Sequence, residues 1–172
     1  MNYAVIKSFD IANGPGVRVS LFVSGCRHKC KNCFNSEAWD FGYGHPFTED
    51  TLKEITDSLN KSYIEGFSLL GGEPFEPENQ PEVCKILTHI KENFPEKTVW
   101  CYTGFDFEKQ LLEGTVGDRD TVLEILKNID VLVDGKFVEE LNSPDLLFRG
   151  SSNQRIIDVK TSLKQGKAVW LP

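Results

Sequence analysis

Strand patterns alternate with helical patterns along this chain, and the alternation restricts its possible folds more than any other feature. Period-two runs of β-branched and aromatic residues predict strands, and apolar residues at helical spacing predict helices between them. The predicted strands are residues 17–23, 66–70, 98–102, 130–133 and 155–159, with a short one at 168–171, and the predicted helices are residues 49–59, 83–94 and 122–129. This order predicts an α/β fold with a parallel sheet and right-handed crossovers.

Length and charge narrow the class of protein. A chain of 172 residues is expected to form a single domain, residues 1–172, with a substantial core. The net charge of −7 argues against nucleic acid or an anionic membrane as the main partner. No apolar run is long enough to span a bilayer, and the first ten residues do not form a secretory signal. Five cysteines, an odd number, favour a reducing cytoplasm over a disulfide framework.

Three of the cysteines, Cys26, Cys30 and Cys33, follow the first predicted strand with the spacing C-x3-C-x2-C. Full protein ligation of a [4Fe–4S] cluster takes four thiolates, so three clustered thiolates leave one iron free to bind another molecule. An open coordination position is typical of a catalytic metal site. The motif therefore indicates a catalytic cluster rather than a purely structural one.

A zinc site is the main alternative interpretation of these cysteines, with His28 or a distant residue as the fourth ligand. Zinc loops more often combine a C-x2-C pair with a second ligand pair far along the chain. No second pair is present, because Cys84 and Cys101 are isolated within a helix pattern and a strand pattern. The spacing therefore favours an iron–sulfur cluster over zinc.

The segment Gly71, Gly72, Glu73 directly follows the second predicted strand. Glycines there form a simple turn, or else they let the backbone approach a ligand closely, with Glu73 meeting a cationic amine. Residues 103–104 and 134–135 are further glycine-bearing segments that follow strands. Since the carboxyl ends of parallel strands share one sheet edge, all these segments and the cysteine loop are expected to converge there.

The cysteine triad paired with Gly71, Gly72 and Glu73 resembles the radical S-adenosylmethionine (SAM) superfamily. The resemblance implies that the three cysteines hold three irons of a [4Fe–4S] cluster. It also implies that SAM chelates the fourth iron and that residues 71–73 receive the SAM amino group. The implied fold is an incomplete, TIM-like barrel of parallel strands with outer helices. The chain is too short to close a full barrel of about 250 residues, and an open sheet would admit a protein segment.

Further segments are similar to the activating enzymes of anaerobic ribonucleotide reductases; they are residues 13–18, 24–25, 102–105, 131–137 and 148–155. This resemblance implies that an external low-potential electron donor, such as a flavodoxin, reduces the cluster. SAM is then cleaved to methionine and a 5′-deoxyadenosyl radical, which takes a hydrogen atom from a glycine of the large reductase subunit. Two alternatives stay open. One is another radical SAM enzyme, either a different glycyl-radical activase or a small-molecule enzyme such as a deazaguanine synthase. The other is a non-catalytic metal-binding module.

Two expectations near the cysteines follow from the same resemblance. Many radical SAM proteins have an aromatic residue just before the third cysteine, where this chain has Asn32, and an aromatic, Phe34, follows instead. The backbone of Asn32, Cys33 and Phe34 is therefore expected to border the adenine. His28 is expected to be a solvent-facing loop residue, because SAM takes the fourth iron.

Several other residues have two interpretations. Asp134 and Lys136 fit ordinary turn chemistry with a solvated lysine, or a contact with the ribose or carboxylate of SAM. Arg149 and Arg155 fit ion pairs with the many acidic residues, or capture of a carboxylate. The aromatic residues expected in the core are Trp39, Trp100 and Phe67.

Overall fold

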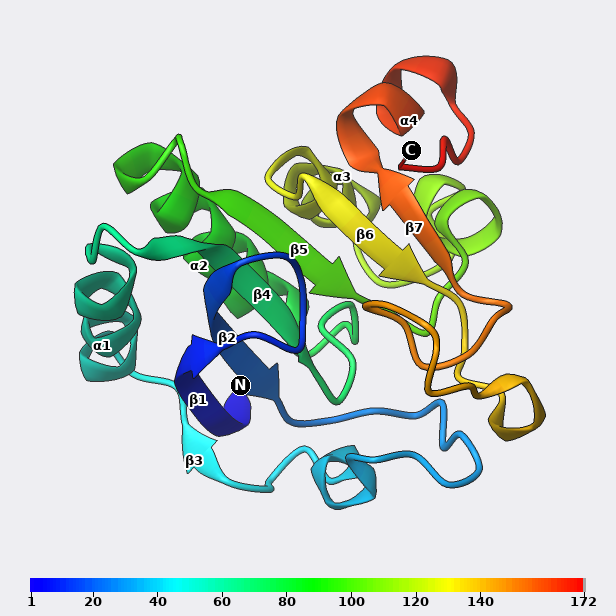
Figure 1. Ribbon diagram of the computed structural model, residues 1–172, viewed down its shortest axis with the longest axis horizontal. Coiled ribbons are helices and arrows are strands. Elements are labelled where there is room, and N and C mark those ends of the chain that lie inside the picture. Colours follow the sequence, from blue (N-terminus) through cyan, green and yellow to red (C-terminus); the bar gives the residue numbers. More distant parts are fainter. Residues whose placement is uncertain (172) are drawn as a thin grey trace.

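A single seven-stranded sheet organises the computed structural model, which describes residues 1–171 (Figure 1). The strand order is β3-β1-β2-β4-β5-β6-β7. The four central strands are mutually parallel and comprise β2 (Val17–Val23), β4 (Ile64–Gly71), β5 (Thr98–Tyr102) and β6 (Val131–Asp134). The protein is therefore a mixed α/β structure whose parallel centre agrees with the strands predicted from the sequence.

Three helices cover one face of this sheet, which is the far side in Figure 1: α1 (Glu49–Leu59), α2 (Gln80–Asn93) and α3 (Arg119–Lys127). Helix α1 begins at the predicted N-cap, where Thr48 and Thr51 form a reciprocal capping box. The inward residues of the helices pack against alternate strand residues, among them Leu21, Leu69 and Leu132, to form the main core. Each fully buried side chain of this size stabilises the fold by about 2 kcal/mol.

The opposite face of the sheet carries a different set of side chains. Trp100, Val131 and Val133 form a small second cluster there, with Tyr102 and Phe148 packed against it. No long helix covers this face among the described residues; segments 11–16 and 142–154 lie over it instead (Figure 1). We call this side the front face, because Figure 1 looks onto it.

The sheet is antiparallel at both edges, so the prediction of a wholly parallel sheet is wrong there. Strand β1 (Asn2–Asp10) is antiparallel to β2, and β7 (Arg155–Asp158) is antiparallel to β6. The six residues between β1 and β2 are too few for the crossover that parallel pairing requires. The short β3 (His45–Pro46) extends the β1 edge, also antiparallel. The sheet does not close, and the predicted barrel form is not confirmed.

The remaining elements are short, and they are η1 (Ser36–Trp39), η2 (Phe107–Leu112), η3 (Glu139–Leu141) and α4 (Val159–Gln165). The strand predicted at residues 168–171 is reduced to a single bridge between Trp170 and Ile157. Within residues 1–171, none of the helices combines the length and apolar character needed to cross a bilayer.

Arg18 fixes segment 11–16 over the front face. Its guanidinium is fully buried and donates to the Ser68 hydroxyl, the Pro15 carbonyl and the Thr98 carbonyl, at 2.8, 3.2 and 2.9 Å. The Ser68 hydroxyl in turn donates to the Asn13 carbonyl at 2.6 Å. Neutral oxygen acceptors thus satisfy a buried cation, and the segment before β2 is bound to the middle of the sheet.

Candidate functional site

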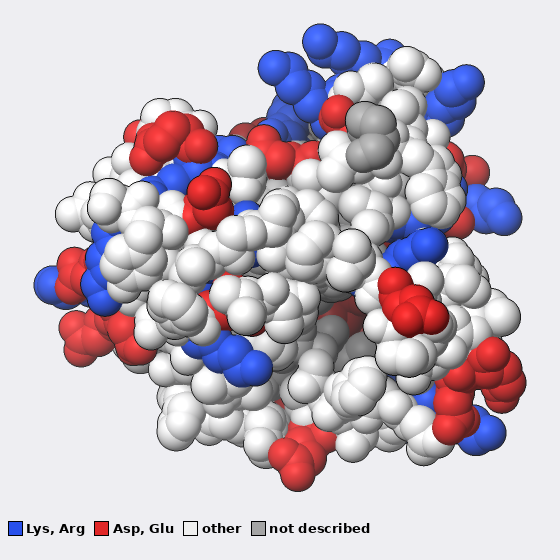
Figure 2. Space-filling view, in the orientation of Figure 1, with Lys and Arg blue, Asp and Glu red and all other residues white. Residues whose placement is uncertain are grey.

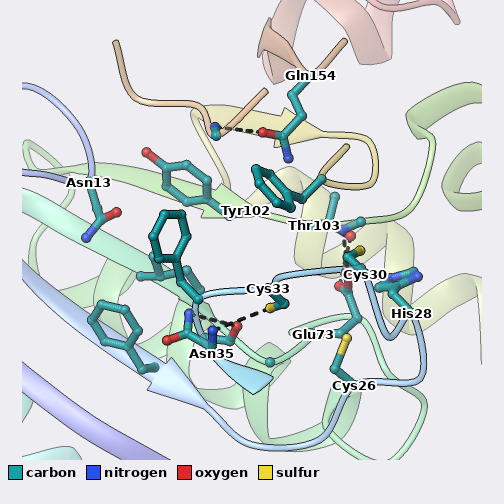
Figure 3. Close-up of a pocket in the computed structure, with 18 of the residues that line it drawn as sticks. Asn13, Cys26, His28, Cys30, Cys33, Asn35, Glu73, Tyr102, Thr103 and Gln154 are labelled. Atoms are coloured by element: carbon teal, nitrogen blue, oxygen red, sulfur yellow. Dashed lines mark hydrogen bonds and ion pairs between the residues drawn. The ribbon is translucent and has the colours of Figure 1, made fainter. Parts of the chain in front are cut away.

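The carboxyl ends of the four parallel strands open onto a cavity of about 610 Å³, which we call the site cavity (Figure 3). Ligand sites of proteins commonly have volumes of about 300–1,000 Å³. The loop after each strand contributes to its wall, and the contributing groups include the three cysteines of the triad, residues 71–73, residues 103–104 and Gly135. The convergence predicted from the sequence is confirmed.

All three cysteines of the triad are free thiols on this wall (Figure 3). Cys26 is buried, and Cys30 and Cys33 are partly buried. Burial raises the pKa of the Cys26 thiol to about 12, and burial also raises the pKa of Cys30. A metal that binds here has to displace these protons, which makes loading pH-dependent.

The spacing of the three sulfurs bears on the zinc alternative. A tetrahedral zinc with bonds of about 2.3 Å holds its sulfurs about 3.8 Å apart. Within residues 1–171, only Asp106, Glu108 and Asp134 bring three potential ligand atoms within 4.8 Å of one another, so at least two of the three triad sulfurs lie farther apart than that. This separation is wider than the sulfur spacing around a single tetrahedral zinc ion.

Glycine in the 71–73 segment allows two loops to pack backbone against backbone. A Cβ on Gly71 would lie 2.5 Å from the amide nitrogen of Val23, and one on Gly72 would lie 2.7 Å from the carbonyl oxygen of Gly25. The amides of Gly72 and Glu73 donate to the carbonyls of Val23 and Gly25, at 2.7 and 2.8 Å. The glycines thus allow a close approach to the start of the cysteine loop, and the predicted close approach to a ligand stays a prediction.

Glu73 organises the site through its carboxylate, which is almost fully buried. The carboxylate accepts hydrogen bonds from the Phe75 amide at 2.9 Å and from the Thr103 hydroxyl and Gly104 amide, both at 2.8 Å. His28 Nε2 lies 2.8 Å from its second oxygen. Both oxygens are therefore engaged with the protein, and Glu73 joins the cysteine loop, the β4 end and the β5 end.

The expectation that His28 faces solvent is wrong. Its side chain is only 8% exposed, and its ring packs edge-on against Phe105 with 4.4 Å between ring centroids. A Cβ on Gly104 would lie 2.6 Å from this ring, so glycine is needed there to admit it. The cysteine loop turns back over the β5 end, and His28 anchors it to Glu73.

Contacts of Lys31 and Asn32 with Glu139 hold the outer part of the cysteine loop. Lys29 and Asn32 both adopt left-handed backbone conformations, with φ of 51° and 56°. The Asn32 side chain donates to Glu139, and Lys31 forms an ion pair with the same carboxylate at 3.1 Å. Cys33 and Phe34 line the site cavity, whereas the Asn32 side chain is turned to Glu139.

Asn35 and Trp39 on the cavity wall were not predicted as site residues, and Tyr102 had only the resemblance of segment 102–105 as a signal. Trp39 was expected in the core but is only partly buried, whereas Phe67 and Trp100 are core residues as predicted. The Trp39 indole nitrogen and the Tyr102 hydroxyl are both buried without a hydrogen-bond partner. Unpartnered polar atoms beside a cavity fit a site that binds a polar ligand.

Comparison with known proteins assigns the family. Residues 12–157 match the family described as a 4Fe-4S single cluster domain. The chain is 44% identical over 158 residues to a protein of Enterobacteria phage T4, covering 91% of this chain and 93% of the relative. It is 40% identical over 156 residues to a protein of Escherichia coli K12, with 90% and 96% coverage, and both are named anaerobic ribonucleoside-triphosphate reductase-activating protein. The chain belongs to this family of activating proteins.

A third member of the activating protein family, from Vibrio cholerae, is 39% identical over 158 residues, covering 91% of this chain and 97% of the relative. The matched family description names a single [4Fe–4S] cluster, which agrees with the cofactor predicted from the cysteines. The residues present fit such a cluster, because three thiols line one cavity. The other two cysteines lie elsewhere, Cys101 in the main core and Cys84 on α2.

Two of the charged residues for which the sequence left two interpretations, Asp134 and Arg155, form an ion pair with each other. Arg155 pairs with Asp134, Glu108 and Asp106 at 2.5, 2.8 and 3.6 Å, which places a cation within that acidic group. Asp134 also accepts from the Phe107 amide at 2.8 Å. Lys136 and Arg149 differ, since Lys136 is exposed and Arg149 lines the site cavity while donating to the Gln154 carbonyl. The ion pair predicted for Arg155 and the exposed lysine predicted at Lys136 are present, whereas a contact of Asp134, Lys136 or Arg149 with SAM stays a prediction.

Proposed function

We propose that this chain is an activating enzyme that generates a glycyl radical on the large subunit of an anaerobic ribonucleotide reductase. In this proposal Cys26, Cys30 and Cys33 hold a [4Fe–4S] cluster, and SAM binds beside it in the site cavity. Three thiols and the backbone of residues 71–73 line the same cavity in a member of the activating protein family, and this arrangement is the main support for the proposal.

When bound, the cluster and SAM would supply the chemistry, namely one-electron reductive cleavage of SAM to methionine and, with one hydrogen atom from the target glycine, 5′-deoxyadenosine. The chain's own residues bind and orient. Because both oxygens of Glu73 are engaged, the SAM amino group is received by the backbone of Gly71, Gly72 and Glu73. The backbone of Asn32, Cys33 and Phe34 borders the adenine.

Substrate access follows from the hollows of the front face, which segments 11–16 and 142–154 cover only in part. The fold in this proposal is a single radical SAM domain, residues 1–172, with the parallel strands and outer helices of an incomplete TIM-like barrel. The helices on one face and the cavity at the carboxyl edge support this assignment. Figure 2 shows that charged side chains lie mostly at the margin of the front face, whereas its centre is largely uncharged and hollowed. A segment of a partner protein has room to enter there.

The electron comes from a separate low-potential donor such as a flavodoxin. The enzyme works in the cytoplasm, where a reducing environment preserves thiols. The five cysteines, all of them free, support this placement. Neither nucleic acid nor a membrane takes part.

An anaerobic assay with the reductase tests the proposal. The protein is reconstituted with iron and sulfide, reduced with dithionite and mixed with SAM and the large reductase subunit. We expect 5′-deoxyadenosine together with the EPR doublet of a glycyl radical on the reductase. Deoxyadenosine without the doublet would favour another radical SAM enzyme. Bound zinc with neither product would favour a metal-binding module.

A further inference from the structure

A second hollow, of about 480 Å³, lies next to the site cavity on the front face. We call it the apolar groove. Its apolar lining comes from β5, β7, segment 142–154 and the C-terminal segment, and it includes Trp100, Leu147, Phe148, Ile156, Trp170 and Leu171. The residues of the groove that carry charge are Asp145 and Arg149. Neither the proposed cluster site nor the proposed SAM site uses this groove.

The walls of the apolar groove are held in place by specific contacts. Trp100 and Phe148 pack edge to face, with ring centroids 5.4 Å apart. The Leu171 amide donates to the Ile156 carbonyl at 2.8 Å, which fastens the C-terminal segment to β7. The Arg149 guanidinium lies over the Trp170 ring at 5.9 Å. The groove is therefore a formed feature of the fold rather than a gap between loose segments.

Two large apolar side chains of this groove face solvent. Leu147 is 73% exposed and Trp170 is 53% exposed. Single exposed apolar residues are common on proteins, but a contiguous apolar hollow bordered by polar groups is typical of a binding surface. In a chain with net charge −7, this mostly apolar hollow is a part of the front face suited to apolar contacts.

The groove is continuous with the site cavity. Leu146, Phe148 and Arg149 line both hollows. Phe148 adopts a left-handed backbone conformation, with φ of 58°, which is unusual for a bulky residue and places its ring between the two hollows. A chain that enters the site cavity from this side therefore passes along the groove.

We propose that the apolar groove docks the reductase segment that carries the target glycine and receives a bulky apolar side chain close to that glycine. This inference rests on the proposed function. A glycine has no side chain to be recognised, so the residues beside it must supply the contacts that hold it in position for hydrogen transfer. Side chains of an extended segment alternate in direction, so a neighbouring side chain enters the groove while the glycine reaches the site cavity.

The test compares a charge placed in the groove with the same charge placed elsewhere. Leu147→Glu puts a carboxylate on a highly exposed groove residue, so the fold is retained. Tyr63→Glu is the matched control, because Tyr63 is an exposed apolar side chain (52%) just before β4 and outside both hollows. A milder variant, Trp170→Ala, removes one groove wall.

Two measurements are made on each variant. Calorimetry measures the affinity of the metal-free protein for the large reductase subunit, and the reconstituted enzyme is assayed for deoxyadenosine without reductase. We expect Leu147→Glu to weaken reductase binding about tenfold or more and Trp170→Ala about threefold to tenfold, consistent with the loss of a buried anchor. Cleavage of SAM without reductase should equal the wild-type rate in all three variants. Tyr63→Glu should bind the reductase like the wild type.

Wild-type reductase affinity in Leu147→Glu would overturn the docking proposal while leaving the proposed function intact. A loss of self-association in that variant, seen by sedimentation without a change in reductase binding, would assign the groove to a second copy of this chain instead. Absence of SAM cleavage in the wild-type protein would refute the proposed function itself. The docking proposal and the function therefore fail in distinguishable ways.

Discussion

The two faces of the sheet differ in how completely apolar side chains fill them. The face under α1, α2 and α3 is a closed apolar core in which Leu69, Leu87 and Leu132 are fully buried. The front face instead has a buried arginine, two unpartnered polar atoms and two adjoining hollows. The first face buries most of the apolar core, and the second has the hollows in which the proposed cofactors and partner would bind. Substitutions on the two faces should therefore separate stability from chemistry.

Arg18 illustrates how the front face stays ordered with only a small apolar cluster. Burial lowers the pKa of its guanidinium to about 10, which leaves it charged at neutral pH. Its acceptors are hydroxyls and carbonyls on β4, β5 and segment 11–16. A charged donor with several acceptors gives directional contacts, which fix the segment without filling the cavity beside it.

The largest expected loss of activity comes from a substitution in the site cavity. Cys30→Ala removes one of the three proposed cluster ligands and should abolish the absorbance of the cluster and all SAM cleavage. Cys84→Ala, on α2, is the control and should retain both, because that thiol lies outside the site cavity. Anaerobic reconstitution followed by absorbance and deoxyadenosine assays checks this, and SAM cleavage in Cys30→Ala would refute the ligand assignment.

The next largest effect concerns the contact between loops at the site. Glu73→Ala leaves the buried Thr103 hydroxyl and the Phe75 amide without their acceptor, so it should lower the free energy of unfolding by about 2–5 kcal/mol. Glu73→Gln keeps acceptor capacity and should lose less. Urea unfolding of the metal-free protein measures both. Equal stability of Glu73→Ala and wild type would mean that the network does not form in solution.

A substitution on the helix-covered face should alter stability alone. Leu87→Ala removes a fully buried side chain from α2 and should lower the free energy of unfolding by about 2–5 kcal/mol. The reconstituted variant should cleave SAM at the wild-type rate per cluster at a temperature where it is folded. A slower rate per cluster would show that the two faces are coupled.

The smallest expected effect tests an unpartnered group. Tyr102→Phe removes a buried hydroxyl that has no hydrogen-bond partner, so the metal-free protein should be unchanged or more stable by up to about 1 kcal/mol. Urea unfolding provides the measurement. A destabilisation of more than about 1 kcal/mol would reveal a partner for this hydroxyl in solution.

Local signals account for the parts that the sequence predicted well. Strand β2 and the Thr48 cap have short-range patterns, and the cysteine triad and residues 71–73 are contiguous motifs after strands. Their meeting at one edge follows from parallel topology alone. The ligands of the proposed cluster can therefore be predicted from the amino-acid sequence by itself.

Contacts distant in sequence account for the parts that it did not. The burial of His28 depends on Glu73, which is 45 residues away, and on the space left by Gly104. Strand β1 has no clean alternation of apolar and polar residues, because apolar residues lie on both of its faces. The π-helical turn Phe107–Leu112 follows neither the α-helical nor the strand period. These features depend on packing and leave no local pattern.

The backbone hydrogen bonds between residues 71–73 and the start of the cysteine loop affect the dynamics of the site. Gly72 and Glu73 donate to carbonyls at the start of the other loop rather than to water. Their protons exchange with solvent only when the two loops separate, so their exchange rates report how often the site comes apart. A cluster bound to the cysteine loop should restrain that loop and slow amide exchange at Gly72 and Glu73 as well. The metal-free protein then differs from the loaded one in the rigidity of the site as well as in the bound cluster.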